Sequence, residues 1–494
     1  MSGLSTLTTK LGAIDLLRMK VSRQLNPKRK VELGQFMTPS NVSQFMASLF
    51  SERKDSIRLL DAGAGVGSLT VAFIDRWGYD AVRVSAYEID SELSSYLQTM
   101  LNKFGNGTFT AEVITRDFIH DAVNQIKIGK KPEFTHAILN PPYKKIGSAS
   151  DHRLLLRQVG IETVNLYSAF LGLTIELMEE CGEIVAIIPR SFCNGLYYKP
   201  FREWLLRKTA IEHIHLFHSR SATFNDDDVL QENIIIKLVR GKKQGRVTIS
   251  TSTDKNFEDF RSHEYPFREI VREDEKQKFI HVPLEPTKKG INGLSMAQCT
   301  LEDLGLTVST GPVVDFRVKE FLCAEPGSGT VPLLYPTHFV TGHMEWPRKT
   351  KKPNALLNHP DMKKWLYPAG FYTVVRRFSS KEERRRIVAH VVDPSSFRAE
   401  SIGFENHLNV FHMQKKGIGA DVAHGLCVFL NATAVDDCFR RFSGHTQVNA
   451  TDLRFLRYPS PKGLEELGQW AQSQGKLTQE LIDQQIEKIN DRRK

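Results

Sequence analysis

Short apolar runs alternate with amphipathic stretches along the first half of the chain. Apolar residues recur at helical spacing in four segments, Ser68–Trp77, Ser91–Phe104, Val164–Cys181 and Lys199–Lys208. Seven further runs have the length and residue types of buried strands: Ile57–Leu60, Val82–Tyr87, Glu112–Ile114, Ala137–Leu139, Glu183–Ile188, His213–Phe217 and Asn233–Val239. This alternation predicts an α/β fold with a mostly parallel seven-stranded sheet wrapped by helices.

The alternation stops after the turn Gly241–Gly245. Beyond it, short strands and charged loops mix with a helical stretch at Leu426–Arg441, and Glu465–Lys494 has the pattern of an amphipathic helix or a helix pair. The pattern predicts four parts, listed here by residue number: a basic helical segment 1–33, an α/β domain 34–242, a mixed α+β domain 243–460 and a helical tail 461–494.

Composition narrows the class of protein. With 494 residues, 40% of them hydrophobic and 25% charged, the chain is long enough for two or three domains of a water-soluble protein. No apolar run has the length of a membrane helix, and the first residues lack a signal-peptide pattern, so we expect a cytoplasmic protein and no membrane partner. The six cysteines are scattered without a C-x-x-C pair, which indicates neither a zinc site nor a disulfide framework.

Positive charge is concentrated in one stretch. The formal net charge is +10, and the segment Trp346–Arg386 holds twelve lysines and arginines against three acids, a balance of +9. Aromatic residues and prolines are interleaved with these charges. Such a mixture is typical of a surface that follows the phosphates of a nucleic acid, although a solvated basic face around a small core has the same composition.

A glycine-rich turn follows the first predicted strand, in Leu59–Ser68. Its spacing is G-x-G-x-G, and the serine at position 68 departs from the dinucleotide fingerprint, which disfavours a nicotinamide cofactor. Glycines let backbone N–H groups approach a ligand at a helix N-terminus. Glu88 ends the next strand, where a carboxylate can hold a ribose diol, and Asp117 follows the third strand, where it could accept from an amino group.

The sequence Asn140-Pro141-Pro142-Tyr143 follows the fourth predicted strand. Two prolines force the chain out of the strand in a rigid turn. The turn places an amide oxygen beside a backbone carbonyl, and both can accept hydrogens from one amino group, while the neighbouring ring can stack on a flat heterocycle. The motif therefore predicts a site for a planar molecule with an exocyclic amine. An ordinary strand-ending turn is the alternative.

Taken in order, these motifs resemble a known family. The series Thr38-Pro39, Asp61 to Gly67, Glu88, Asp117 and Asn140–Tyr143 is similar to the S-adenosylmethionine-dependent DNA amino-methyltransferases in their gamma arrangement. The resemblance covers about residues 30–240. Within the family the chain resembles modification enzymes of type II restriction systems, of the Pst/Bsu branch, through 34–39 and 165–170. A thinner likeness to their DNA-reading segments lies in 430–450.

The resemblance implies a Rossmann-like methyltransferase domain followed by a DNA-recognition domain. It also implies S-adenosylmethionine as methyl donor, with no metal. The residues expected around this cofactor are Thr38 and Pro39 at its methionine end; Asp61, Ala62, Gly63, Gly65 and Gly67 along the glycine turn; Glu88 and Ile89 at the ribose; and Asp117 and Phe118 at the adenine.

The same resemblance implies how the substrate is held. A target base must leave the duplex to reach such a site. Asn140 and the Pro141 carbonyl would accept the hydrogens of its amino group, in the turn completed by Pro142. Tyr143 would stack on one face of the base and Phe224 on the other, with Phe192 as a second candidate. The residues expected to contact DNA phosphates are Lys144, Lys145, Arg153, Arg376 and Arg377.

The expected function is site-specific methylation of duplex DNA at N6 of adenine, which protects the site from a cognate restriction endonuclease. We expect a monomer rather than a dimer. Cytosine N4 stays open, because the same acceptors could hold either amine. RNA and protein-glutamine methyltransferases share the N-P-P-Y motif, and a catalytically inactive DNA-binding subunit is a further alternative. A fused nuclease has little support, since the sequence has no convincing metal-binding carboxylate–lysine cluster.

Overall fold

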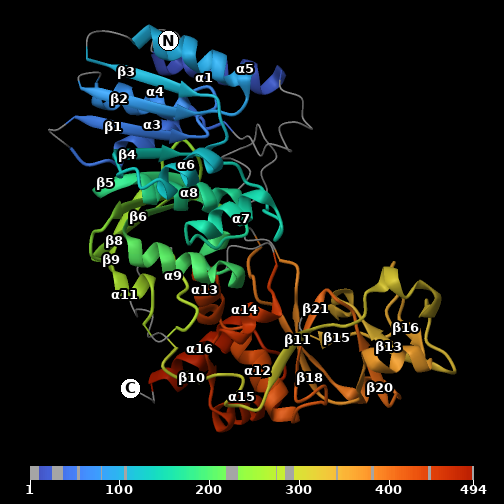
Figure 1. Ribbon diagram of the computed structural model, residues 1–494. Coiled ribbons are helices and arrows are strands. Elements are labelled where there is room, and N and C mark those ends of the chain that lie inside the picture. Colours follow the sequence, from blue (N-terminus) through green and yellow to red (C-terminus); the bar gives the residue numbers. More distant parts are fainter. Residues whose placement is uncertain are drawn as a thin grey trace, which may run out of the picture. The chain divides into compact units, whose positions relative to one another are not determined.

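Figure 1 shows the computed structural model of the chain. The structure describes residues 10–24, 37–52, 56–78, 81–104, 108–217, 232–273, 275–283, 294–340, 343–379, 383–442 and 447–491. The chain divides into two compact units, Met1–Pro286 and Thr287–Lys494. Among the helices described, none is long and apolar enough to cross a membrane.

A nine-stranded sheet forms the centre of the first unit, in the order β3-β2-β1-β4-β5-β7-β6-β8-β9. Its strands are β1 (Ile57–Ala62), β2 (Val82–Tyr87), β3 (Thr110–Ile114), β4 (Phe134–Leu139), β5 (Met178–Pro189), β6 (Thr209–Phe217), β7 (Asn233–Arg240), β8 (Arg246–Ser252) and β9 (Arg261–Pro266). The strands from β3 to β5 run parallel, and every residue of β4 is buried. Coverage on both faces explains why these strands are continuous apolar runs in the sequence.

The sheet is larger and more mixed than the sequence predicted. It has nine strands rather than seven, because β8 and β9 extend it beyond β6, and β7 is antiparallel to both of its neighbours. Gly241, at a φ of 69°, makes the turn after β7. A turn rich in glycine and lysine has the composition of a linker between domains. The sequence pattern therefore predicted a domain boundary there. The four-part division stays a prediction beside the two observed units.

Helices cover both faces of the sheet (Figure 1). One apolar core contains residues of α1 (Lys10–Gln24), α3 (Ser40–Ser48), α4 (Ser68–Trp77) and α5 (Ser91–Leu101). The core on the other face contains residues of α6 (Phe118–Lys127), α7 (Asp151–Gln158), α8 (Leu166–Leu177), α9 (Lys199–Lys208) and α11 (Phe267–Ile270). The bounds of α4 and α9 agree with the sequence pattern, whereas α8 is shorter than predicted because its end passes directly into β5.

The second unit mixes short strands with helices. A four-stranded sheet has the order β11-β21-β18-β19, and a five-stranded sheet has the order β12-β16-β13-β20-β17. The strands are β10 (Ala297–Cys299), β11 (Thr307–Thr310), β12 (Leu322–Cys323), β13 (Thr330–Leu334), β14 (Phe339–Val340), β15 (His343–Met344), β16 (Ala355–Leu357), β17 (Leu366–Pro368), β18 (Tyr372–Arg376), β19 (Ala389–Val392), β20 (Ser401–Phe404), β21 (Leu408–His412) and β22 (Tyr458–Pro459).

The helices of this unit are α12 (Ala420–Leu430), α13 (Thr433–Phe442), α14 (Ala450–Arg454), α15 (Pro461–Ser473) and α16 (Gln479–Asp491). The single helix predicted at Leu426–Arg441 is therefore two, interrupted at residues 431–432. The last two helices form the pair that the C-terminal pattern allowed.

The topology of the first unit brings four motifs together. Strands β1 to β4 are parallel neighbours, so their carboxyl ends meet at one edge of the sheet. The glycine turn follows β1, Glu88 follows β2, Asp117 follows β3 and Asn140 follows β4. Gly63 and Asn140, which are 140 − 63 = 77 positions apart in the sequence, consequently lie at one place.

Candidate active site

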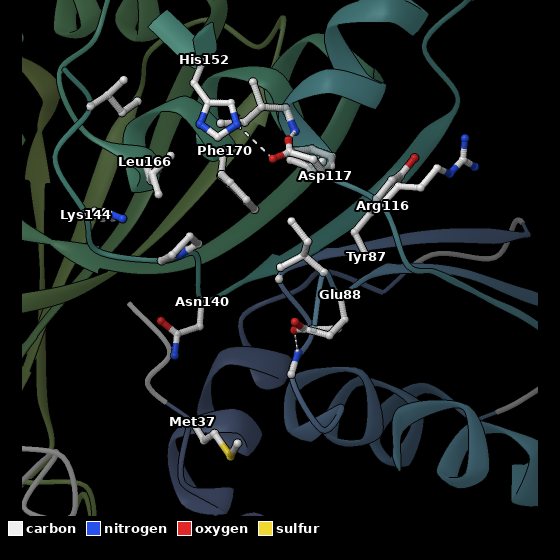
Figure 2. A pocket seen from close by; sticks show the side chains of 18 of the residues that line it. Met37, Tyr87, Glu88, Arg116, Asp117, Asn140, Lys144, His152, Leu166 and Phe170 are labelled. Atoms are coloured by element: carbon white, nitrogen blue, oxygen red, sulfur yellow. Dashed lines mark hydrogen bonds and ion pairs between the residues drawn. The ribbon is translucent and has the colours of Figure 1, made fainter. Parts of the chain in front are cut away.

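A cavity of about 390 Å³ lies at this edge of the sheet. Figure 2 shows Glu88, Asp117 and Asn140 around it, with Phe170 and His152 on the side opposite Met37. Eleven of the residues predicted from the sequence line the cavity: Thr38, Gly63, Gly65, Glu88, Ile89, Asp117, Phe118, Asn140, Pro142, Lys144 and Lys145. Among the residues predicted for the cofactor and for catalysis, six do not border it directly: Pro39, Asp61, Ala62, Gly67, Pro141 and Tyr143.

The glycine turn needs its glycines for two different reasons. Gly63, Gly65 and Gly67 all have positive φ values, of 83°, 58° and 91°, which side chains rarely adopt. A Cβ at Gly67 would also lie 2.6 Å from Leu97, so this glycine serves packing. A Cβ at Gly65 would meet nothing within 4 Å and would project into open space. The turn thus leaves room for a ligand to approach the backbone.

Glu88 is fixed by the backbone on both sides of its carboxylate. Its Oε2 accepts the N–H of Gly65 at 2.9 Å, and its Oε1 accepts the N–H of Asp90 at 2.8 Å. Burial raises the pKa of Glu88, while these hydrogen bonds oppose the shift. Each oxygen retains a second lone pair, so the carboxylate can accept two hydroxyls of a diol.

Asp61 lies beneath the glycine turn rather than in the cavity. It is fully buried, and its Oδ2 accepts the Thr70 hydroxyl at 2.6 Å. Burial raises the pKa of Asp61 to about 7, with a smaller contribution from the nearby charge of Glu88. The side chain therefore ties the end of β1 to α4, and it would border a cofactor only through the backbone above it.

Asp117 has a helix-capping role as well as a place in the cavity. Its Oδ1 accepts the N–H groups of Ile119 and His120 at the start of α6, and its Oδ2 bonds Nε2 of His152 at 2.9 Å (Figure 2). Burial alone would raise the pKa of Asp117, but the hydrogen bonds from His152 and from the backbone outweigh it and lower the pKa. The same partnership raises the pKa of His152.

A second histidine–carboxylate pair joins the same two helices, between Nε2 of His120 and Asp151 at 2.9 Å. Together with Asp117 and His152, this brings ligand atoms of Asp117, His120 and His152 within 4.8 Å of one another. Each of the three side chains already has a hydrogen-bond or ion-pair partner within the protein. We therefore attribute the cluster to attachment of α7 to α6 at the cavity wall.

Aromatic and apolar side chains form the remaining wall. The rings of Phe118 and Phe170 have centroids 5.0 Å apart, and Ile89 is 55% exposed at the cavity. Phe170, Leu166, His152 and Arg116 also line the cavity and were not assigned from the sequence. Leu166 and Phe170 are four positions apart on α8, a spacing that marks one helix face, but the pattern did not show which face meets a ligand.

The N-P-P-Y turn holds a neutral amide at the other end of the cavity. Asn140 donates from Nδ2 to Oγ1 of Thr38 at 2.9 Å. The Tyr143 hydroxyl lies 3.0 Å from Oδ1 of Asn140 and 3.1 Å from the carbonyl oxygen of Ile187. A Cβ on Gly63 would lie 3.8 Å from the Asn140 carbonyl, so the glycine turn and the N-P-P-Y turn are in contact.

The aromatic ring expected opposite Tyr143 is not placed. Phe224 lies outside the described residues, so its stacking role stays a prediction. Phe192, the second candidate, is fully buried between Phe201 and Tyr167 in the core of the first unit. It is therefore unavailable to a base, because any stacking would require that core to open.

The five residues expected at DNA phosphates have different surroundings. Lys144 and Lys145 are exposed where they line the cavity. Arg153 donates to Glu162, which also pairs with Arg157. In the second unit, Arg376 pairs with Glu383, and Arg377 donates to the carbonyl oxygen of Asn406 and lies over the ring of Phe378.

Comparison with known proteins identifies close relatives. The family model for the Eco57I restriction-modification methylase matches residues 82–224. Type II methyltransferase M.BsuBI of Bacillus subtilis is 51% identical over 500 residues, covering 98% of this chain and 99% of its own length. Type II methyltransferase M.PstI of Providencia stuartii is 42% identical and covers 96% of each chain.

A solved structure is similar over most of the chain. The cryo-electron microscopy structure of a DrdV–DNA complex has a TM-score of 0.52 at 13% sequence identity, and the match covers 94% of this chain and 59% of that one. Identity this low indicates a shared fold only.

Proposed function

The chain belongs to the type II DNA methyltransferases of restriction–modification systems, and from that premise we propose which atoms carry out its reaction. The enzyme transfers a methyl group from S-adenosylmethionine to DNA. We propose that the acceptor is N6 of an adenine turned out of the duplex, and that Asn140 is the residue that holds it.

The first unit suits this cofactor. Open space at Gly65 admits a ligand to the backbone, the Glu88 carboxylate has acceptor capacity for a ribose diol, and Phe118, Phe170 and Ile89 offer apolar surface for a flat ring. When bound, S-adenosylmethionine supplies a methyl group on a positively charged sulfur. Oδ2 of Asp117 uses one lone pair for its hydrogen bond with His152, and its second lone pair can accept from an amino group of the cofactor.

Asn140 carries the proposal, because its amide lies at the end of the cavity next to the glycine turn. Its Oδ1 and the Pro141 carbonyl accept the two hydrogens of the target amino group. This favours a nitrogen whose lone pair is no longer delocalised into the ring and is directed toward the methyl group, and the acceptor dipoles stabilise the positive charge that develops on nitrogen. A nitrogen–carbon bond forms as the sulfur–carbon bond breaks, and the nitrogen then releases one proton to solvent.

The surrounding groups orient the base. The Tyr143 ring covers one face, and Lys144 and Lys145 meet phosphates beside the target nucleotide. The second unit, with its basic stretch 346–386, reads the DNA sequence. We propose that the enzyme works as a monomer, that it needs no metal, and that it protects the sites of a cognate nuclease.

One experiment tests the proposed acceptor. Duplex DNA, RNA and protein are incubated in parallel with labelled S-adenosylmethionine and the full chain, and the DNA product is hydrolysed to nucleosides. We expect label in duplex DNA as N6-methyladenine. Label in N4-methylcytosine would overturn the proposed base, and label in RNA or protein alone would overturn the substrate.

A further inference from the structure

Thr38 contacts the amide that the proposed reaction depends on. It precedes Asn140 by 102 positions, yet its Oγ1 accepts the Nδ2 hydrogen of Asn140 at 2.9 Å. Thr38 is only 3% exposed and lines the cavity. A contact between residues so distant in sequence, on the side chain that would hold the target amine, can influence the reaction without touching the base.

The backbone at Thr38 is itself held in place. The next residue, Pro39, is the N-cap of α3, and its carbonyl accepts both the N–H of Ser43 at 3.0 Å and the Ser43 hydroxyl at 3.1 Å. The N–H of Ser40 donates to Asp15 of α1 at 3.3 Å. Two helices therefore fix the position from which the Thr38 hydroxyl meets Asn140.

A second hydroxyl lies on the opposite side of the amide. Tyr143 has one phenolic proton and two acceptors in reach, Oδ1 of Asn140 and the carbonyl oxygen of Ile187. When an amino group donates to Oδ1, the phenol can donate to Ile187 instead. Thr38 then remains as the partner that keeps Nδ2 turned away from the target.

We propose that Thr38 is a positioning residue for methyl transfer, because it holds the Asn140 amide so that Oδ1 faces the target amine. The inference rests on the proposed role of Asn140. An amide rotated by half a turn would present N–H groups to the hydrogens of the amine, and the two donors would repel each other. Misplacement of a reacting group by about 1 Å can lower a rate on the order of 100-fold.

This role differs measurably from the one implied by family resemblance, in which Thr38 touches the methionine end of the cofactor. A cofactor contact would change the affinity for S-adenosylmethionine. A positioning contact would change the transfer rate when S-adenosylmethionine is saturating. The two quantities can be measured separately on the same protein.

The test uses Thr38→Val, which keeps the shape and removes the acceptor, and Thr38→Ser, which restores a hydroxyl. Thr174→Val is the matched control, because Thr174 is fully buried in α8 and its hydroxyl has no hydrogen-bond partner in the described structure. For each full-length variant, calorimetry gives the Kd for S-adenosylmethionine, and rapid quench gives the single-turnover rate on duplex DNA. Thermal unfolding verifies that each variant is folded.

We expect Thr38→Val to lower the single-turnover rate about 10- to 100-fold with the Kd within about threefold of wild type. Thr38→Ser should recover most of the rate, and Thr174→Val should leave both quantities unchanged. A raised Kd with a normal rate at saturation would overturn the inference, as would equal losses in the valine and serine variants. These outcomes are ratios to wild type, so they stay informative even if the methylated base proves to be cytosine.

Discussion

The two ends of the cavity are built from different chemistry. At the end that we propose for the cofactor, called the cofactor end below, Glu88 and Asp117 are carboxylates whose oxygens already accept backbone N–H groups. At the end that we propose for methyl transfer, called the transfer end below, Asn140 is an uncharged amide between the hydroxyls of Thr38 and Tyr143. In the reaction that we propose, the first end would hold the cofactor through charged groups, and the second would present neutral dipoles to the reacting nitrogen.

The difference shows where pH can act. Burial raises the pKa of Tyr143, so neither that phenol nor an amide changes its protonation state near neutral pH. The pKa values of Glu88, Asp117 and His152 are shifted by their surroundings, and all three lie at the cofactor end. We therefore expect the rate of methyl transfer at saturating cofactor to be insensitive to pH near neutrality. The affinity for the cofactor should depend on pH.

The strongest way to separate the two ends is Asn140→Ala. Loss of the acceptor oxygen should lower the single-turnover rate about 100- to 1000-fold, the usual consequence of removing one transition-state hydrogen bond. Calorimetry should give a Kd for S-adenosylmethionine close to that of wild type. If the Kd rises in proportion to the lost rate, the ends are not independent.

The substitution Glu88→Gln changes the cofactor end of the cavity and leaves the transfer end intact. The amide nitrogen would face a backbone N–H of Gly65 or Asp90, so one charge-assisted hydrogen bond is lost, worth about 1.5–3 kcal/mol. We expect the Kd for S-adenosylmethionine to rise about 10- to 100-fold while the rate at saturation is retained. Glu92→Gln, on the exposed face of α5, is the matched control. A variant with normal affinity and a low rate would reverse the assignment of this end.

The combined change Lys144→Gln and Lys145→Gln addresses the cavity rim. Two fewer phosphate contacts should flatten the dependence of log affinity for duplex DNA on log salt by about 1.8, and weaken binding uniformly across sequences. Fluorescence anisotropy at several salt concentrations measures this slope. Lys103→Gln with Lys131→Gln, exposed lysines that do not line the cavity, controls for net charge. An equal slope in both double variants would place the phosphates elsewhere.

His152→Gln gives the smallest expected effect. The pKa of His152 is raised above 6.5 by Asp117, so the charged pair stabilises the fold below pH 6.5 and is lost as pH rises through the raised pKa. It is lost at acid pH as well, when Asp117 is protonated below its lowered pKa. Because both side chains are partly exposed, we expect less than about 1 kcal/mol.

Denaturant unfolding of wild type and His152→Gln at pH 5.5 and pH 8.5 measures this contribution. The difference in free energy of unfolding should be larger at pH 5.5. Thr38→Val, at the transfer end, should show the same difference from wild type at both values. If His152→Gln lowers the free energy of unfolding equally at both pH values, the pair with Asp117 does not contribute through its charge, and the proposed electrostatic difference between the two ends is wrong.

The sequence predicted the cavity residues that directly follow strands. Gly65, Glu88, Asp117 and Asn140 each come at or just after the end of a parallel strand, so chain order and strand spacing suffice to bring them together. The family suggested by those motifs is confirmed by relatives that are similar over nearly the whole chain. The individual roles of these four cavity residues in the reaction stay predictions.

Other features could not be predicted because they depend on packing between irregular segments. His152 and Phe170 reach the cavity from helices whose angle to the sheet is not encoded by a local pattern. The partner of Arg376, Glu383, is seven positions further along a stretch of sequence that offers several acids and bases as partners. Strands β8 and β9 were missed since a tight turn at Gly241 resembles a linker.

The insertion of β7 between β5 and β6 affects how the protein is made. During synthesis β6 leaves the ribosome before β7, yet it has no direct pairing with β5 in the finished sheet. The edge of β5 that pairs with β7 therefore stays unpaired until β7, which ends at Arg240, has emerged. Because non-local pairing of this kind is slow and exposes sheet edges, we expect nascent chains that end between β6 and β7 to be the species most dependent on chaperones.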